Sequence, residues 1–146
     1  MWNNIEKEKR SAEHLLYVSL KYTKTCDVIL NLISRWQGMI SESINSLLEK
    51  AKKNKLIKTI PVAPKMKSDL AAKIFSKEKI VQDALELYSF FKRIPQLEQF
   101  REYEFRKNVR LRVLYNNKNI EINLEKLKEY QELLERFILF VRDYIK

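Results

Sequence analysis

The sequence has few of the residues that interrupt regular structure. One glycine and three prolines among 146 residues leave little punctuation for a many-stranded sheet and favour long helices. A single cysteine excludes a disulfide framework and indicates a reducing compartment. No apolar run approaches the roughly 20 residues of a membrane span, and segment 1–10 is too polar for a signal peptide. We therefore expect a cytoplasmic protein with no membrane association.

Residues that commonly catalyse reactions or bind metals are also scarce. His14 is the only histidine, and no second histidine or cysteine stands at metal-ligand spacing. Cys26 belongs to an apolar helical pattern and is most simply a core residue, since a catalytic thiol needs a base and only His14 could serve. We expect no metal, no cofactor and no catalytic residue. A metal-independent ribonuclease that uses His14 is kept only as a third class of function.

The totals describe a globular, strongly basic chain. Hydrophobic residues make up 45% and charged residues 33% of the sequence, and its length is enough for one domain over 1–146. The net charge of +10 favours a polyanionic partner such as nucleic acid or an anionic membrane. The alternative is that the surface is merely basic, as in many small soluble proteins.

One long amphipathic helix over 25–54 organises the chain. Eight residues recur there at steps of three and four, which places them on one helical face: Cys26, Ile29, Ile33, Trp36, Ile40, Ile44, Leu47 and Ala51. Thr25 suits the N-cap, and the lysines after Leu48 suit the negative end of the helix dipole. Such a helix is stable only when other helices cover its apolar face.

The remaining segments are shorter. We expect a first helix that is capped by Asn3 or Asn4, breaks near Thr23 and forms a hairpin with the long helix. A crossing loop over 56–67 and short helices over 69–75, 76–95 and 96–108 should follow. The last helix should be capped by Asn123. The last helix has more apolar residues than one neighbour can cover, which predicts a homodimer: Leu133, Phe137, Ile138, Phe140, Val141 and Tyr144.

The helical period changes to a strand period at Val109. Apolar side chains alternate with Arg110 and Arg112 before the turn sequence 116–119, and alternation resumes beyond it, which predicts a β-hairpin. Together these patterns predict an all-α fold. We expect a four-helix, up-and-down-type bundle with a long helical pair, short accessory helices and a small β-hairpin before the last helix.

Two basic clusters are candidates for ligand binding. The first has seven lysines and no acid between residues 50 and 67, and a helix end with a solvated loop explains it most simply. The second is interleaved with Tyr103 and Phe105 and consists of Arg101, Arg106, Lys107, Arg110 and Arg112. Two arginines on the open face of a hairpin would make a compact phosphate site beside aromatic rings for base stacking. The alternative is that the arginines pair with nearby acids, which are Glu102, Glu104 and Glu121.

Four short segments resemble the HEPN superfamily of prokaryotic helical bundles. They are 12–16 (AEHLL), 44–49 (INSLLE), 18–25 (VSLKYTKT) and 105–109 (FRKNV), and the resemblance is greatest to small archaeal members. HEPN ribonucleases have an arginine followed four to six residues later by histidine. No histidine follows Arg106, so the resemblance implies a member without the nuclease signature. Asn108 could still orient a ligand and joins the candidate residues. The resemblance also implies dimerisation and association with RNA, nucleotides or a nucleotidyltransferase partner.

Our leading expectation is a non-catalytic, dimeric protein that binds RNA, another nucleic acid or a nucleotide through the arginine cluster. The alternative is a protein-interaction subunit that pairs with a nucleotidyltransferase-like partner and touches no nucleic acid.

Overall fold

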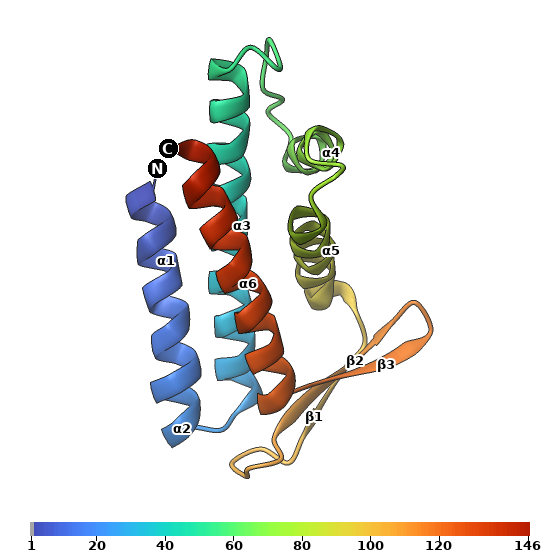
Figure 1. Ribbon diagram of the computed structural model, residues 1–146. Coiled ribbons are helices and arrows are strands. Elements are labelled where there is room, and N and C mark those ends of the chain that lie inside the picture. Colours follow the sequence, from blue (N-terminus) through green and yellow to red (C-terminus); the bar gives the residue numbers. More distant parts are fainter. Residues whose placement is uncertain (1) are drawn as a thin grey trace.

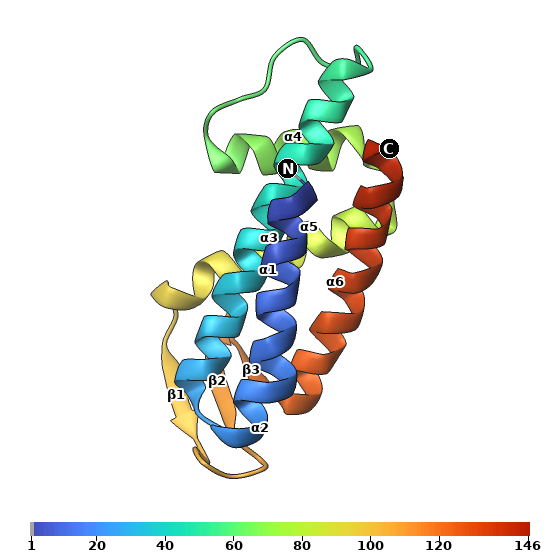
Figure 2. The same cartoon turned by 90° about the vertical axis from the view of Figure 1, so that its left-hand side faces the viewer.

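The computed structural model describes residues 2–146 as a helical body with a three-stranded antiparallel sheet at one end (Figure 1). Three long elements, α1 (Trp2–His14), α3 (Cys26–Lys53) and α6 (Leu124–Ile145), follow the long axis of the molecule. Figure 2 shows α4 (Pro64–Ile74) and α5 (Lys79–Arg93) lying across them. The prediction of an all-α, up-and-down four-helix bundle is therefore wrong. The segment between α3 and α6 contains two crossing helices and the sheet, and it returns the chain so that α6 runs in the same direction as α3.

Helix α3 is the centre of the fold, as predicted. All eight residues of its predicted apolar face are buried, and the Thr25 side chain accepts a hydrogen bond from the backbone N–H of Val28 at the expected N-cap. Trp36 is fully buried and joins three helices, because it stacks on Phe91 of α5 and its Nε1 donates to Gln131 Oε1 of α6 at 3.3 Å. The periodicity of the sequence thus identified the core helix and its register.

The first helix starts slightly earlier and is less regular than its pattern suggests. It begins at Trp2, so Asn3 and Asn4 lie inside its first turn and do not cap it. It continues through a π-helical turn, η1 (Leu15–Ser19), into α2 (Leu20–Tyr22), and the chain then turns back into α3. The helical hairpin and the break near Thr23 are confirmed.

The two crossing helices differ from the prediction in their starting points. Helix α4 begins at Pro64, five residues before the predicted start at Asp69, because proline is well tolerated in a first turn that needs no backbone donor. Helix α5 begins at Lys79 and ends at Arg93, where a 3-10 turn, η2 (Ile94–Gln96), contains Pro95.

The sheet consists of β1 (Gln99–Glu102), β2 (Arg110–Tyr115) and β3 (Lys118–Asn123) in that order. The predicted hairpin is confirmed: Asn116 and Asn117 both have positive φ in the two-residue turn between β2 and β3. The predicted helix over 96–108 is wrong. Part of that segment is β1, which pairs with β2 from Gln99↔Val113 to Glu102↔Arg110. A third strand stabilises a hairpin that would be marginal alone.

Helix α6 begins as predicted, with Asn123 Oδ1 accepting from the backbone N–H of Lys126 at 2.8 Å. Most of its apolar side chains are covered within the single chain, but Leu139 is 49% exposed. Phe137 and Val141 are fully buried, and Phe140 packs edge-on against Phe75. Leu133, Phe140 and Tyr144 are only partly buried, so part of the apolar surplus remains on this helix, and the homodimer stays a prediction. None of the helices in residues 2–146 is both long and apolar enough to cross a membrane.

Candidate nucleic-acid interface

The sheet separates apolar from charged side chains by simple alternation. Val109 and the β2 residues Leu111 and Val113 are fully buried against the helical body. Arg110 and Arg112 lie on the other face of the same strand and are partly exposed. The open face that the sequence predicts therefore exists, and both arginines lie on it.

Carboxylates on the neighbouring strands form ion pairs with these two arginines. Glu102 Oε1 on β1 lies 2.9 Å from Arg110 Nε and 3.2 Å from Arg112 Nε, so one carboxylate oxygen serves both guanidiniums. Glu121 on β3 lies 3.1 Å from Arg110, and Arg112 also donates to Asn119 Oδ1 at 3.0 Å. The hydrogen bond from Arg110 lowers the pKa of Glu102 and raises that of Arg110. The formal charges of the two arginines and two glutamates cancel.

Aromatic rings complete this open face. The Arg112 guanidinium lies 4.2 Å from the Phe100 ring centroid, and that of Arg110 lies 5.2 Å from Tyr103. The faces of both rings are thus already in contact with cations of the same chain. The alternative of paired arginines describes this face better than a free phosphate site does.

Arg101 is turned away from Arg110 and Arg112. Its Nη1 lies 2.8 Å from Asp27 in the first turn of α3 and 3.9 Å from Glu104, and the hydrogen bond to Asp27 raises the pKa of Arg101. This ion pair joins the edge strand to the N-terminus of the central helix. The structure therefore divides the predicted cluster instead of bringing it together.

The remaining candidates belong to the loop between β1 and β2, residues 103–108, which we call the aromatic loop. Two hydrogen bonds hold it to the first residue of α3 and to the turn before that helix. Glu104 Oε1 accepts from the backbone N–H of Cys26 at 3.0 Å, and the backbone N–H of Phe105 donates to the carbonyl of Lys24 at 2.6 Å. The aromatic loop is therefore held beside the end of α2, although the two segments are far apart in sequence.

The backbone of the aromatic loop is strained at its two aromatic residues. Tyr103 has a φ of 55° and Phe105 a φ of 67°, in the left-handed region that bulky side chains rarely adopt. Each such residue costs on the order of 1–3 kcal/mol and persists only where surrounding contacts impose it. The conformation exposes 75% of Phe105 to solvent.

Arg106, Lys107 and Asn108 follow Phe105 and are all exposed. Within the described part of the chain, neither Arg106 nor Lys107 forms an ion pair. Their positive charges are therefore free for an external anion, in contrast to those of Arg101, Arg110 and Arg112. Free cations beside an exposed aromatic ring suit a phosphate–base ligand.

The tertiary structure adds residues that we did not select from the sequence. Lys21 and Tyr22 at the end of α2 and Lys24 in the turn that follows lie where the aromatic loop is bonded, and Tyr22 is 78% exposed. Both views show the end of α2 beside the β1–β2 loop at one tip of the molecule (Figures 1 and 2). The only signal in the sequence is the single aromatic residue Tyr22 between Lys21 and Lys24.

The two residues considered for catalysis are Cys26 and His14. Burial raises the pKa of the Cys26 thiol to about 11, and its Sγ donates to the carbonyl of Arg110 at 3.3 Å. The thiol is therefore protonated and engaged at neutral pH. His14 is exposed at the end of α1. Among residues 2–146, no three His, Cys, Asp or Glu side chains are grouped to hold a metal ion.

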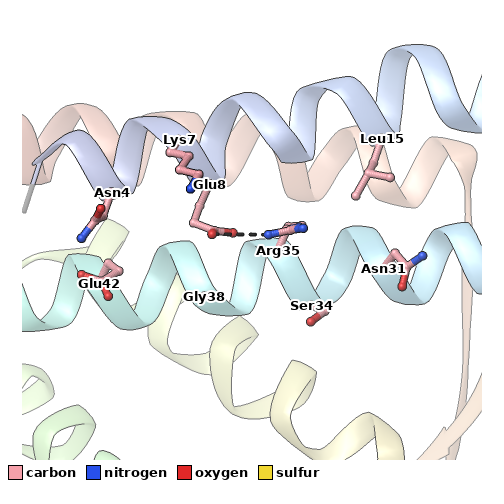
Figure 3. A pocket seen from close by; sticks show the side chains of 9 residues that line it. All are labelled: Asn4, Lys7, Glu8, Leu15, Asn31, Ser34, Arg35, Gly38 and Glu42. Carbon is pink, nitrogen blue, oxygen red and sulfur yellow. Dashed lines mark ion pairs between the residues drawn. The ribbon is translucent and has the colours of Figure 1, made fainter.

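A concave surface away from the sheet lies between α1 and α3 (Figure 3). Glu8 and Arg35 meet across it at 3.5 Å, and Lys7 and Glu42 also line it. Charges of both signs alternate along this groove, so it has no net preference for an anion. Of the lysines of 50–67, Lys67 donates to Asn45 and Lys65 pairs with Asp69, whereas Lys50, Lys52 and Lys53 line a separate hollow beside Ile145 of α6.

Comparison of the chain with known proteins identifies no related protein. The chain matches no family model, no curated protein and no solved structure. The resemblance to HEPN proteins therefore stays a prediction.

Proposed function

We propose that the protein binds nucleic acid without catalysis and that its phosphate contacts come from the aromatic loop. One observation carries this proposal: Arg106 and Lys107 are exposed and unpaired in the described chain, directly beside the exposed ring of Phe105. The net charge of +10 adds a long-range attraction for polyanions.

The paired arginines have a smaller part in this proposal. A phosphate that approached Arg110 or Arg112 would have to compete with Glu102 and Glu121, which already neutralise them. By contrast, a phosphate at Arg106 replaces only water and counterions. Arg110 and Arg112 support the strand that leads into the loop, and we expect them to contribute less to affinity than Arg106 and Lys107.

The test measures RNA affinity across a salt series. Replacing Arg106 and Lys107 together by alanine should weaken binding and flatten the slope of log affinity against log salt by between about one and two units, because two phosphate contacts are lost. Folding should be unchanged, since neither side chain forms an ion pair in the described structure. Failure of the wild-type protein to retain RNA at low salt would remove the proposal.

Two double variants serve as controls. Lys52→Ala with Lys53→Ala removes the same +2 charge at the far end of α3, and an equal loss there would indicate diffuse attraction instead of a site. Arg110→Ala with Arg112→Ala should reduce stability, since Glu102 loses both partners, and should reduce affinity less than the loop variant does.

Apart from the predicted homodimer, the alternative function is a protein-interaction subunit that pairs with a nucleotidyltransferase-like partner. One observation favours this alternative: in the π-helical turn η1, Tyr17 is 53% exposed and Val18 is 41% exposed. π-helical turns are frequent at functional sites. Light scattering that gives twice the mass of one 17.6 kDa chain would support the homodimer.

A further inference from the structure

We infer that Tyr22 and Phe105 form a two-ring platform that stacks the unpaired bases of single-stranded nucleic acid, with Lys21 and Lys24 as additional phosphate contacts. This inference rests on the proposed function and names its ligand class. It adds residues from the α2–α3 turn to a site otherwise formed by the aromatic loop.

The proximity of the two segments is given by backbone contacts. The N–H of Phe105 donates to the carbonyl of Lys24, and Tyr22 precedes Lys24 by two residues. Two residues of chain span at most about 7 Å, so both rings project from one small area of the surface. Because the aromatic loop is also bonded to Cys26 through Glu104, this arrangement exists before a ligand binds.

Ring availability distinguishes Phe105 from the neighbouring rings of Phe100 and Tyr103, and high exposure distinguishes Tyr22. Guanidiniums lie over the rings of Phe100 and Tyr103. In residues 2–146, no cation or second ring lies over Phe105, and only the Lys21 ammonium, at 5.8 Å, approaches the ring of Tyr22. Both rings are therefore exposed, and Phe105 has open faces.

The same features favour a single strand over a duplex. A base in a duplex has both faces covered by its stacked neighbours, whereas an unpaired base offers a face to an aromatic side chain. Lys21, Lys24, Arg106 and Lys107 lie within two residues of one of the two rings in sequence and supply cations for a flexible phosphate backbone, although the Lys24 ammonium also donates to the carbonyl of Lys21 at 2.6 Å. Stacking needs no hydrogen bonds to base edges, so we expect little sequence preference.

The test uses a short single-stranded RNA with one 2-aminopurine, and the same strand annealed to its complement. Phe105→Leu and Tyr22→Leu each keep the charge and remove a ring. Each should weaken single-strand binding by roughly 5- to 160-fold, the effect of losing one stacked base, with an unchanged salt slope. The quenching of 2-aminopurine fluorescence on binding should decrease in both variants. Binding of the duplex should be weaker than that of the single strand and indifferent to either substitution.

Tyr17→Leu is the matched control, because Tyr17 is also an exposed aromatic residue but lies on the π-helical turn. Wild-type affinity in either of the first two variants, or an equal loss with Tyr17→Leu, would overturn the inference. The proposed function would survive that result if Arg106→Ala with Lys107→Ala still weakened binding. Absence of any RNA binding by the wild-type protein would remove both.

Discussion

The carboxylate of Glu104 accepts a hydrogen bond from the backbone N–H of Cys26, 78 positions earlier in the chain, at 3.0 Å. This bond satisfies one of the free donors at the N-terminus of α3 and at the same time holds the aromatic loop against the helix. The stability of the central helix and the position of the candidate binding loop are thus linked through one side chain.

Glu104→Ala should therefore destabilise the protein by about 1 kcal/mol, as the loss of a helix cap usually does. Urea denaturation measures this change. Glu104→Gln keeps an oxygen acceptor at the same position and should retain most of the stability. Equal midpoints for the alanine variant and the wild type would show that the bond contributes nothing.

The core position of Ile40 predicts a much larger effect. Ile40 is fully buried on the apolar face of α3, so Ile40→Asp places an unpaired charge in the core and should cost several kcal/mol, enough to unfold a typical domain. The conservative change Ile40→Val should cost only about 0.5–1.5 kcal/mol. Circular dichroism during thermal unfolding distinguishes the two, and a folded Ile40→Asp variant with an unchanged midpoint would contradict the packing.

The pairing of Glu102 predicts a pH dependence of stability. Its pKa in the folded protein is lowered from 4.5, chiefly by the hydrogen bond from Arg110. A group with a lowered folded pKa stabilises the fold above its unfolded pKa and loses that contribution as the pH falls through the folded value. Glu102→Gln should therefore flatten the loss of stability in acid below about pH 4.5. The same slope in variant and wild type, measured by denaturation at a series of pH values, would refute this role.

The thiol of Cys26 should be unreactive in the folded state. It is buried and its pKa is raised to about 11, so little thiolate exists near neutral pH. A chromogenic disulfide reagent should react slowly with the native protein and rapidly in urea. Fast stoichiometric reaction without denaturant would show that the thiol is accessible.

Several elements were predictable because their causes are local in the sequence. The apolar period of α3, the Thr25 and Asn123 caps, and the Asn116–Asn117 turn each depend on residues within a few positions of one another. Such signals survive folding because helix periodicity and preferred φ values belong to short segments. They were sufficient to predict the core helix and the β2–β3 hairpin.

The tertiary structure alone decided the identity of β1 and the state of the arginines. Residues 99–102 have no strong period of their own, and they form a strand because β2 offers backbone partners. Whether Arg110 meets Glu102 or a ligand depends on strand register, which places the two side chains next to each other. The position of Phe105 beside Lys24 likewise comes from a contact across the fold. The sequence by itself determined the helical framework and the excess of positive charge, whereas long-range pairing determined which of those charges are free.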